Sequence, residues 1–178
     1  MLGVKTNRID RHTCTFKADN VDLSYMQTDD FKRRASSLRG SIMIMGPLVA
    51  RFGKAYFPKP GGDKIGRRRL DTHFCGFQKL GATFNFDAGE VFYSIEGQNM
   101  KGTYMLLDEA SVTGTANILM AAVLAEGETT IYNAACEPYV QQLSRMLVQM
   151  GAKIEGIGSN MLKITGVKEL KGCKHSIL

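Results

Sequence analysis

The 178-residue sequence contains no tryptophan and few histidines, cysteines and prolines. Its four cysteines are far apart and form no Cys-x-x-Cys pair. Together with three scattered histidines they make a poor zinc site, so reduced thiols are expected. No window approaches 18 uninterrupted apolar residues, and the first ten residues lack the apolar core of a signal peptide. These absences argue against a membrane span and a secreted protein and predict a cytoplasmic domain.

A formal net charge of +6 raises the possibility of a nucleic-acid partner. The basic residues, however, concentrate at 32–39 and 64–69, while 84–96 and 106–128 are neutral to acidic. No aromatic-interleaved RNA-binding motif or zinc finger is present. We therefore expect neither a nucleic-acid nor a membrane partner. A cationic pocket for phosphates or carboxylates explains the clustering, with a solvated basic face as the alternative.

The chain contains an internal repeat. GSIMIMGPLVARFG (40–53) and GTANILMAAVLAEG (114–127) have equal length, are bounded by glycines and are apolar nearly all round. A helix with no polar face belongs in a core, and each run is followed by a short strand-like piece. Pro47 lies inside the first run, so that helix is expected to kink there or to begin late.

The halves that follow also match, 72–102 against 140–172. Each is predicted to form an amphipathic helix, a glycine stop, a strand, a turn and a second strand. The segment 2–21 resembles the strand–turn–strand end of a third copy. The sequence therefore predicts one α/β domain that is a fragment of a longer protein. Its units are a partial repeat at 1–21 and repeats at 40–102 and 114–172.

Local signals mark the ends of these elements. Asp71 or Thr72 is expected to cap the first amphipathic helix, and Pro138 fits the first turn of the second. Alternating apolar and polar residues at 83–86 and 162–165 predict half-buried strands.

The two copies differ in the stretch KPGGDKIGRRRLDTH (59–73). The first copy is longer from Gly53 to Gly81 than the second is from Gly127 to Gly151, and the surplus falls in this stretch. Its glycines permit a close approach to a ligand, and its three arginines precede a helix N-terminus, where anions are favoured. A phosphorylated or carboxylated ligand is therefore expected, with a tolerated loop insertion as the alternative.

Asp63 is the only carboxylate in the first half of this stretch. A free aspartate has a pKa of about 3.9, and nearby arginines lower it further. Asp63 can serve as a general acid only if burial and a bound anion that neutralises the arginines raise its pKa. Otherwise it is a counter-ion.

A second candidate site is LDEASVTGTAN (107–117), where the hydroxyls of Ser111, Thr113 and Thr115 lie at the start of a buried helix. Simple N-capping explains them as well as ligand contact does. Arg39 opens the other apolar run and is expected to need an anionic partner. His73 is interpreted as a surface or capping-turn residue.

The motifs RGSIMIMGPLVARFG, PGGDKIGRRRLDTH, GFQKLGA, ASVTGTANILMAAVLAEG and NAACEP resemble the UDP-N-acetylglucosamine 1-carboxyvinyltransferase family of enolpyruvyl transferases. The similarity runs over residues 2–178 without a long gap. It implies an enolpyruvyl-transferase-like α/β fold, in which repeated units place buried helices inside and sheets outside. This chain would be most of one of two similar domains.

The resemblance implies transfer of an enolpyruvyl group from phosphoenolpyruvate to the 3-hydroxyl of UDP-N-acetylglucosamine, the first committed step of peptidoglycan synthesis. No metal or redox cofactor is implied, and the partners are the two substrates and the second domain. Without that domain, residues 1–178 are not expected to turn over. The loop acid falls on Asp63, and the implied substrate-binding residues are Arg39, Arg68, Arg69, Leu70, Asp71, Thr72, Glu109, Ala110, Ser111 and Val112.

Three departures from the family pattern are informative. Asp63 replaces a commoner cysteine, and relatives with this change resist fosfomycin, which alkylates the thiol. Arg69 stands where many relatives have proline and Glu109 where many have lysine, which puts nucleotide contacts at these positions in doubt. Two alternatives stay open, a 5-enolpyruvylshikimate-3-phosphate (EPSP) synthase-like transferase and a non-catalytic module that binds anions or nucleic acid.

Overall fold

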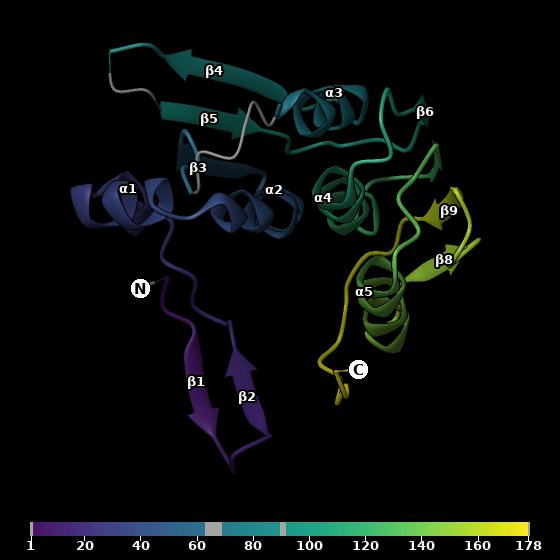
Figure 1. Cartoon of the computed structure of the whole chain (residues 1–178), viewed down its shortest axis with the longest axis horizontal. Helices are drawn as coiled ribbons and strands as arrows, with labels where there is room; N and C mark the ends of the chain where they lie inside the picture. The colour runs from purple at the N-terminus through teal and green to yellow at the C-terminus, as the bar shows by residue number, and fades with distance from the viewer. Residues whose placement is uncertain (1, 63–68, 90–91, 178) are drawn as a thin grey trace.

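The computed structural model describes residues 2–62, 69–89 and 92–177. Within these ranges the chain forms five α-helices and three small β-sheets, so the predicted α/β class is confirmed (Figure 1). One continuous cluster of buried apolar residues, drawn from helices and from both larger sheets, forms the core. None of the described helices is long and apolar enough to cross a membrane.

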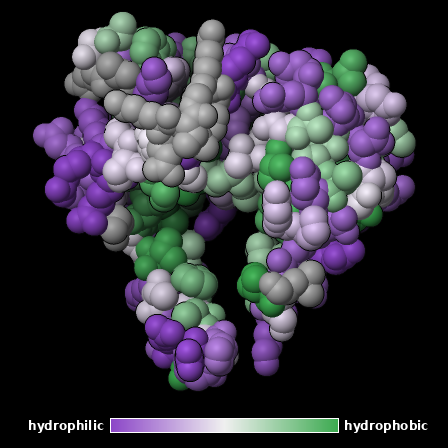
Figure 2. Space-filling view, viewed as in Figure 1, coloured by the Kyte–Doolittle hydropathy of each residue, from purple (hydrophilic) through white to green (hydrophobic). Residues whose placement is uncertain are grey.

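The N-terminal segment is a β-hairpin that projects from the body of the molecule (Figure 1). Strand β1 (Lys5–Arg8) pairs antiparallel with β2 (Cys14–Lys17), as the sequence predicts, and both strands are exposed along their length. Arg51 donates a hydrogen bond to the carbonyl oxygen of Ala18 at 2.9 Å where the hairpin meets the body. In Figure 2 hydrophobic surface gathers at that junction, while the tip of the hairpin is largely hydrophilic.

Two short helices precede the first apolar run, which itself begins as a 3-10 helix and becomes α-helical at Met45. The expectation that Pro47 delays the helix is confirmed, because Pro47 falls in the first turn of the α-helix, where a missing N–H is tolerated. Gly53 ends this helix at φ +70°, in the left-handed region that glycine adopts readily. The elements are η1 (Ser24–Gln27), α1 (Asp29–Ser36), η2 (Arg39–Ile44), α2 (Met45–Phe52) and β3 (Lys54–Pro58).

The next segment contains α3 (Asp71–Lys79), β4 (Thr83–Asp87) and β5 (Phe92–Glu96). Its strands complete an antiparallel three-stranded sheet of order β3-β5-β4. Aromatic rings join α3 to this sheet, with the Phe74 ring centroid 4.9 Å from that of Phe84 and 5.3 Å from that of Tyr93.

The elements of the second half are β6 (Tyr104–Leu106), α4 (Val112–Ala122), β7 (Glu128–Tyr132), α5 (Pro138–Gln149), β8 (Lys153–Glu155) and β9 (Met161–Thr165). Its strands form a four-stranded sheet of order β6-β7-β9-β8, in which only the β6–β7 pair is parallel among the described strands. Pro138 occupies the first turn of α5, as predicted. From α2 and from α4 onward, the elements follow in the same order of helix, strand, helix, strand, strand.

The burial of the strands agrees with the sequence in one sheet and differs in the other. Along β9, Leu162 and Ile164 are buried between exposed neighbours, as the alternation predicts. Along β4 the half-buried prediction is wrong, because only Phe84 is partly covered. Phe86 is 51% exposed although its ring lies 4.6 Å from that of Tyr93 on β5, so it packs along the sheet and not into the core.

Candidate functional site

The candidate site lies at the start of α4. Ser111 is the N-cap, and its hydroxyl accepts a hydrogen bond from the backbone N–H of Gly114 at 3.2 Å. Glu109 and Ala110, exposed, and Val112, half-buried, surround this cap. The capping interpretation of Ser111 is confirmed, whereas its contact with a substrate remains a prediction. Thr115 lies apart from this group, because it is fully buried and accepts a hydrogen bond from the Ala135 N–H at 3.0 Å.

The segment before α3 meets this helix start. The hydroxyl of Thr72 lies 3.1 Å from a carboxylate oxygen of Asp108 and 3.3 Å from one of Glu109. Thr72 is only 3% exposed, so these carboxylates are the acceptors for its proton. The structure therefore brings together two segments that the family resemblance implies for substrate binding.

The predicted cap of α3 is wrong. Leu70 occupies the N-cap position without a side-chain hydrogen bond, and the helix begins at Asp71. Neither predicted capping side chain turns back to the helix, because the Thr72 hydroxyl faces α4 and the Asp71 carboxylate forms an ion pair with Arg69. Asp71 raises the pKa of the Arg69 guanidinium, and the more distant charges of Asp108 and Glu109 raise it further.

Arg39 lies against both ends of the stretch 63–68. Before this stretch, Gly62 adopts φ +93°, and a β-carbon there would lie 3.1 Å from the Arg39 Cβ. After it, the Arg39 guanidinium donates a hydrogen bond to the carbonyl oxygen of Arg69 at 3.1 Å. At Gly61 a β-carbon would overlap the Ser36 carbonyl oxygen, so both glycines lie close to other parts of the protein. Their close approach to a ligand stays a prediction.

Asp63 and Arg68, the predicted loop acid and loop arginine, lie outside the described residues. Of the other predicted site residues, Arg39 contacts the backbone of Arg69 and Thr72 contacts Glu109. Leu70 is half-buried at the start of α3. Three separate parts of the sequence therefore converge on one surface.

The interpretation of His73 as a surface residue is wrong, because its side chain is only 2% exposed. One ring nitrogen, Nε2, lies 3.2 Å from the Thr113 hydroxyl, and the other, Nδ1, lies 3.0 Å from the side-chain amide nitrogen of Asn117. Burial lowers the pKa of His73 to about 4, and the charge of Arg39 contributes in the same direction. The imidazole is therefore neutral near pH 7.

Asn117 is a residue that the sequence interpretation missed. It is fully buried in α4, and its amide contacts Gly46, Ile42 and His73. The available signal was a single amide within the apolar run GTANILMAAVLAEG. A polar group in such a run must be hydrogen-bonded, since an unpaired buried amide is strongly destabilising.

Glycines allow the three helices to approach one another. A β-carbon at Gly76 of α3 would overlap the Ile118 side chain, and one at Gly114 would lie 2.8 Å from the Thr72 Cγ2. A β-carbon at Gly46 of α2 would overlap the Asn117 carbonyl oxygen and lie 3.1 Å from the Met120 Cβ. The small residues thus set the spacing of the helices beneath the site.

Replacing Gly46 with alanine is expected to lower the free energy of unfolding by about 2 kcal/mol, because overpacking forces α2 away from α4. Urea unfolding measures this loss. Gly40→Ala is the matched control, since an added β-carbon there would meet only the Leu38 side chain, at 4.0 Å. Equal stability of the two variants would contradict the close approach of α2 and α4.

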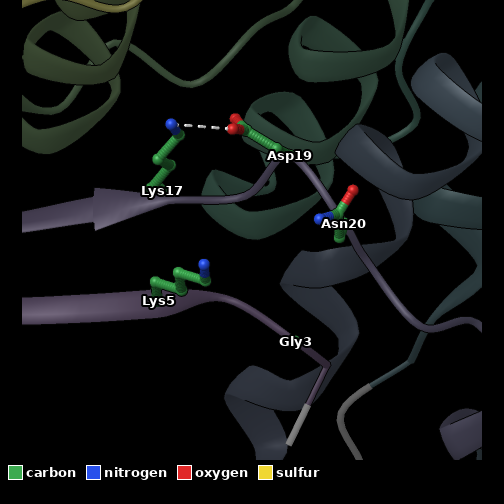
Figure 3. A pocket seen from close by; sticks show the side chains of 5 residues that line it. All are labelled: Gly3, Lys5, Lys17, Asp19 and Asn20. Atoms are coloured by element: carbon green, nitrogen blue, oxygen red, sulfur yellow. Dashed lines mark ion pairs between the residues drawn. The ribbon is translucent and has the colours of Figure 1, made fainter.

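The hollow shown in Figure 3 lies elsewhere, at the base of the hairpin. It has a volume of about 50 Å³ and is lined by Gly3, Lys5, Lys17, Asp19 and Asn20. Lys17 and Asp19 form an ion pair across 3.0 Å. This volume suits water and is far too small for a sugar nucleotide. Among the described residues, no group of three or more histidine, cysteine, aspartate or glutamate side chains is placed to hold a metal ion.

The whole chain, residues 1–178, matches the family described as EPSP synthase (3-phosphoshikimate 1-carboxyvinyltransferase). The chain belongs to this family. The likeness of the motifs to UDP-N-acetylglucosamine 1-carboxyvinyltransferases is also confirmed. The chain is 64% identical to such a protein from Bacteroides thetaiotaomicron and 62% identical to one from Porphyromonas gingivalis, over 177 residues in each case.

These matches cover 99% of the chain but 41% of either relative, so the chain spans about two fifths of their length. Among solved structures, the enolpyruvyl transferase NikO from Streptomyces tendae is similar, with a TM-score of 0.72 and 20% identity. That likeness covers 96% of this chain and 39% of NikO. An EPSP synthase from Acinetobacter baumannii matches with a TM-score of 0.66, also at 20% identity, over 96% of this chain and 38% of that one. At this identity the two structures show a shared carboxyvinyltransferase fold.

Proposed function

We propose that the protein carrying this chain transfers the enolpyruvyl group of phosphoenolpyruvate to the 3-hydroxyl of UDP-N-acetylglucosamine. The hydroxyl oxygen gives up its proton and adds to C2 of phosphoenolpyruvate, while the methylene carbon takes up a proton. The tetrahedral adduct then loses phosphate and a methyl proton to restore the double bond. The observation that carries this proposal is the convergence of Arg39, the segment 69–72 and the segment 109–112.

The roles of individual residues are proposed from the family resemblance of the motifs. Asp63 is proposed as the acid that protonates the methylene carbon, and Arg68 as the loop arginine that contacts the anionic substrate. Arg39 donates to the Arg69 backbone and carries a delocalised charge suited to phosphate or carboxylate. The segments 69–72 and 109–112 are proposed to hold the sugar nucleotide.

The organisation of the whole protein is part of the same proposal. The matching order of elements from α2 and from α4 supports two copies of one unit, at 40–102 and 114–172, with helices inside and sheets outside. The hairpin at 1–21 would be the end of a third. Because the relatives are longer than this chain, a second domain is proposed to complete the site. A cytoplasmic location suits both substrates.

Phosphate release from phosphoenolpyruvate by the full-length protein tests the proposal. It is expected with UDP-N-acetylglucosamine and not with shikimate 3-phosphate as the acceptor. If the protein turns over only shikimate 3-phosphate, its function is that of an EPSP synthase and the proposed function is wrong. The second acceptor belongs in the assay because the family description and a solved relative both carry the EPSP synthase name.

Arg39→Lys in the full-length protein is expected to lower kcat/KM for UDP-N-acetylglucosamine by about tenfold or more, because lysine lacks the planar fork of donors. Steady-state kinetics measure the change. Arg51→Lys is the matched control, since Arg51 also donates to a backbone carbonyl but lies at the base of the hairpin. Similar losses in both variants would show that Arg39 acts only through stability.

A further inference from the structure

The side chain of Asn117 connects three parts of the molecule beneath the candidate site. Its Oδ1 accepts a hydrogen bond from the Gly46 N–H at 2.8 Å, at the start of α2. Its Nδ2 lies 2.8 Å from the carbonyl oxygen of Ile42, in η2, and 3.0 Å from Nδ1 of His73, in α3. Asn117 itself belongs to α4 and is fully buried.

These partners fix the orientation of the amide. A backbone N–H can only donate, so the atom facing Gly46 must be the oxygen. A backbone carbonyl can only accept, so the atom facing Ile42 must be the NH₂ group. The same NH₂ group faces the imidazole of His73. The Nδ1 atom of His73 must therefore accept, which leaves it without a proton.

The tautomer of His73 follows from this orientation. A neutral imidazole that accepts at Nδ1 carries its proton on Nε2. Nε2 lies 3.2 Å from the Thr113 hydroxyl oxygen, so this N–H donates to Thr113 in the first turn of α4. A chain of directed hydrogen bonds thus runs from Gly46 and Ile42 through Asn117 and His73 to the helix start that carries Ser111.

Each end of this chain lies next to residues of the proposed substrate site. Ile42 is one turn beyond Arg39 in η2, and His73 directly follows Thr72. Thr113 follows the segment 109–112. We propose that Asn117 is a positioning residue, which holds η2, α3 and α4 in the one arrangement that presents all three groups to substrate. This inference rests on the proposed function for the identity of the substrate.

A purely structural role would predict a different result. Loss of buried hydrogen bonds lowers stability wherever it occurs, but only a change in the relative placement of these segments raises KM. Thr115→Val provides the comparison, because Thr115 is also buried in α4 and its hydroxyl bonds the Ala135 N–H, away from the site.

Asn117→Asp is the decisive variant, since it keeps the size of the side chain and the acceptor for Gly46. It replaces the NH₂ group with an oxygen that faces two acceptors, the Ile42 carbonyl oxygen and His73 Nδ1. An ionised carboxylate repels both acceptors, and a protonated carboxyl can donate to only one of them, so at least one hydrogen bond is lost. In the full-length protein, KM for UDP-N-acetylglucosamine is expected to rise about tenfold, which corresponds to the loss of about one hydrogen bond. Thr115→Val is expected to lower the melting temperature without changing KM.

An unchanged KM in Asn117→Asp, or equal KM changes in both variants, would overturn the positioning role. If Asn117→Asp does not fold, nitrogen NMR of the histidines in the natural protein decides instead. The positioning role is supported if His73 is protonated at Nε2 and unprotonated at Nδ1, and if these nitrogen chemical shifts change when UDP-N-acetylglucosamine is added. A protonated Nδ1, or no response to the substrate, refutes it. If the natural protein uses shikimate 3-phosphate, the proposed function fails and the same comparisons with that acceptor still decide the role of Asn117.

Discussion

Fosfomycin is expected to inactivate the Asp63→Cys variant of the full-length protein and to leave the natural protein active. The drug alkylates a thiolate by opening its epoxide ring, and a carboxylate is a much weaker nucleophile. The sequence places Arg67, Arg68 and Arg69 within six residues of position 63, and positive charge favours the thiolate. Residual activity and a mass increase of one drug molecule measure the reaction.

The natural protein contains its own control for this experiment. Cys75 is exposed and free on α3, close in sequence to the predicted loop. Alkylation that requires the site, and not merely a thiol, leaves Cys75 unmodified in both proteins. Inactivation of the natural protein, or inactivation of the variant with the drug on Cys75 and none at position 63, would contradict the assignment of Asp63 to the loop-acid position.

Asp63→Asn separates the two interpretations of this carboxylate. A general acid contributes about a hundredfold or more to the rate, so the amide variant is expected to lose at least that factor in kcat. Full activity of Asp63→Asn would instead make Asp63 a counter-ion for the arginines.

Acid is expected to destabilise the fold through His73. Its pKa is about 4 in the folded state and about 6.5 when unfolded. Between these values the unfolded chain binds a proton that the folded chain does not, so stability falls as the pH decreases. Across the window the loss amounts to about 3 kcal/mol, at about 1.4 kcal/mol for each pH step. Urea unfolding from pH 7 to pH 4.5 measures it.

His73→Gln is the matched variant, because glutamine does not titrate in this range. It is expected to be less stable at pH 7 and to show a flatter dependence on pH. Asp30, whose pKa is held low by hydrogen bonds from Tyr25, Arg33 and Arg34, affects stability only at lower pH. Parallel pH curves for the natural protein and His73→Gln would show that His73 titrates normally.

The sequence was sufficient for the elements that depend on local signals. Gly81 and Gly151 end their helices at positive φ, and Pro138 sits in a first turn, because these residues act through their own backbone preferences. The grouping of Arg39 with segments 69–72 and 109–112 in one site came from the family resemblance. Hydropathy alone does not show which residues, far apart in the sequence, lie together on one surface.

The errors share a physical cause, which is that tertiary partners override local preference. Thr72 has the chemistry of an N-cap but turns to Asp108 and Glu109, because α4 lies within reach. His73 is polar enough for a surface yet is buried, since Asn117 and Thr113 satisfy both ring nitrogens. Phe86 alternates as a core residue would but finds its neighbour in Tyr93 on the same sheet.

The hydrogen bonds of Asn117 also bear on how the fold is reached. They join residues separated by 44, 71 and 75 positions along the chain. Closing loops of this length carries an entropy penalty before any bond compensates it, and such contacts slow folding. The surface that would receive the substrate therefore cannot assemble from any one hairpin or helix pair. It comes into being only when the two halves of the chain have met, which makes its formation one of the late events of folding.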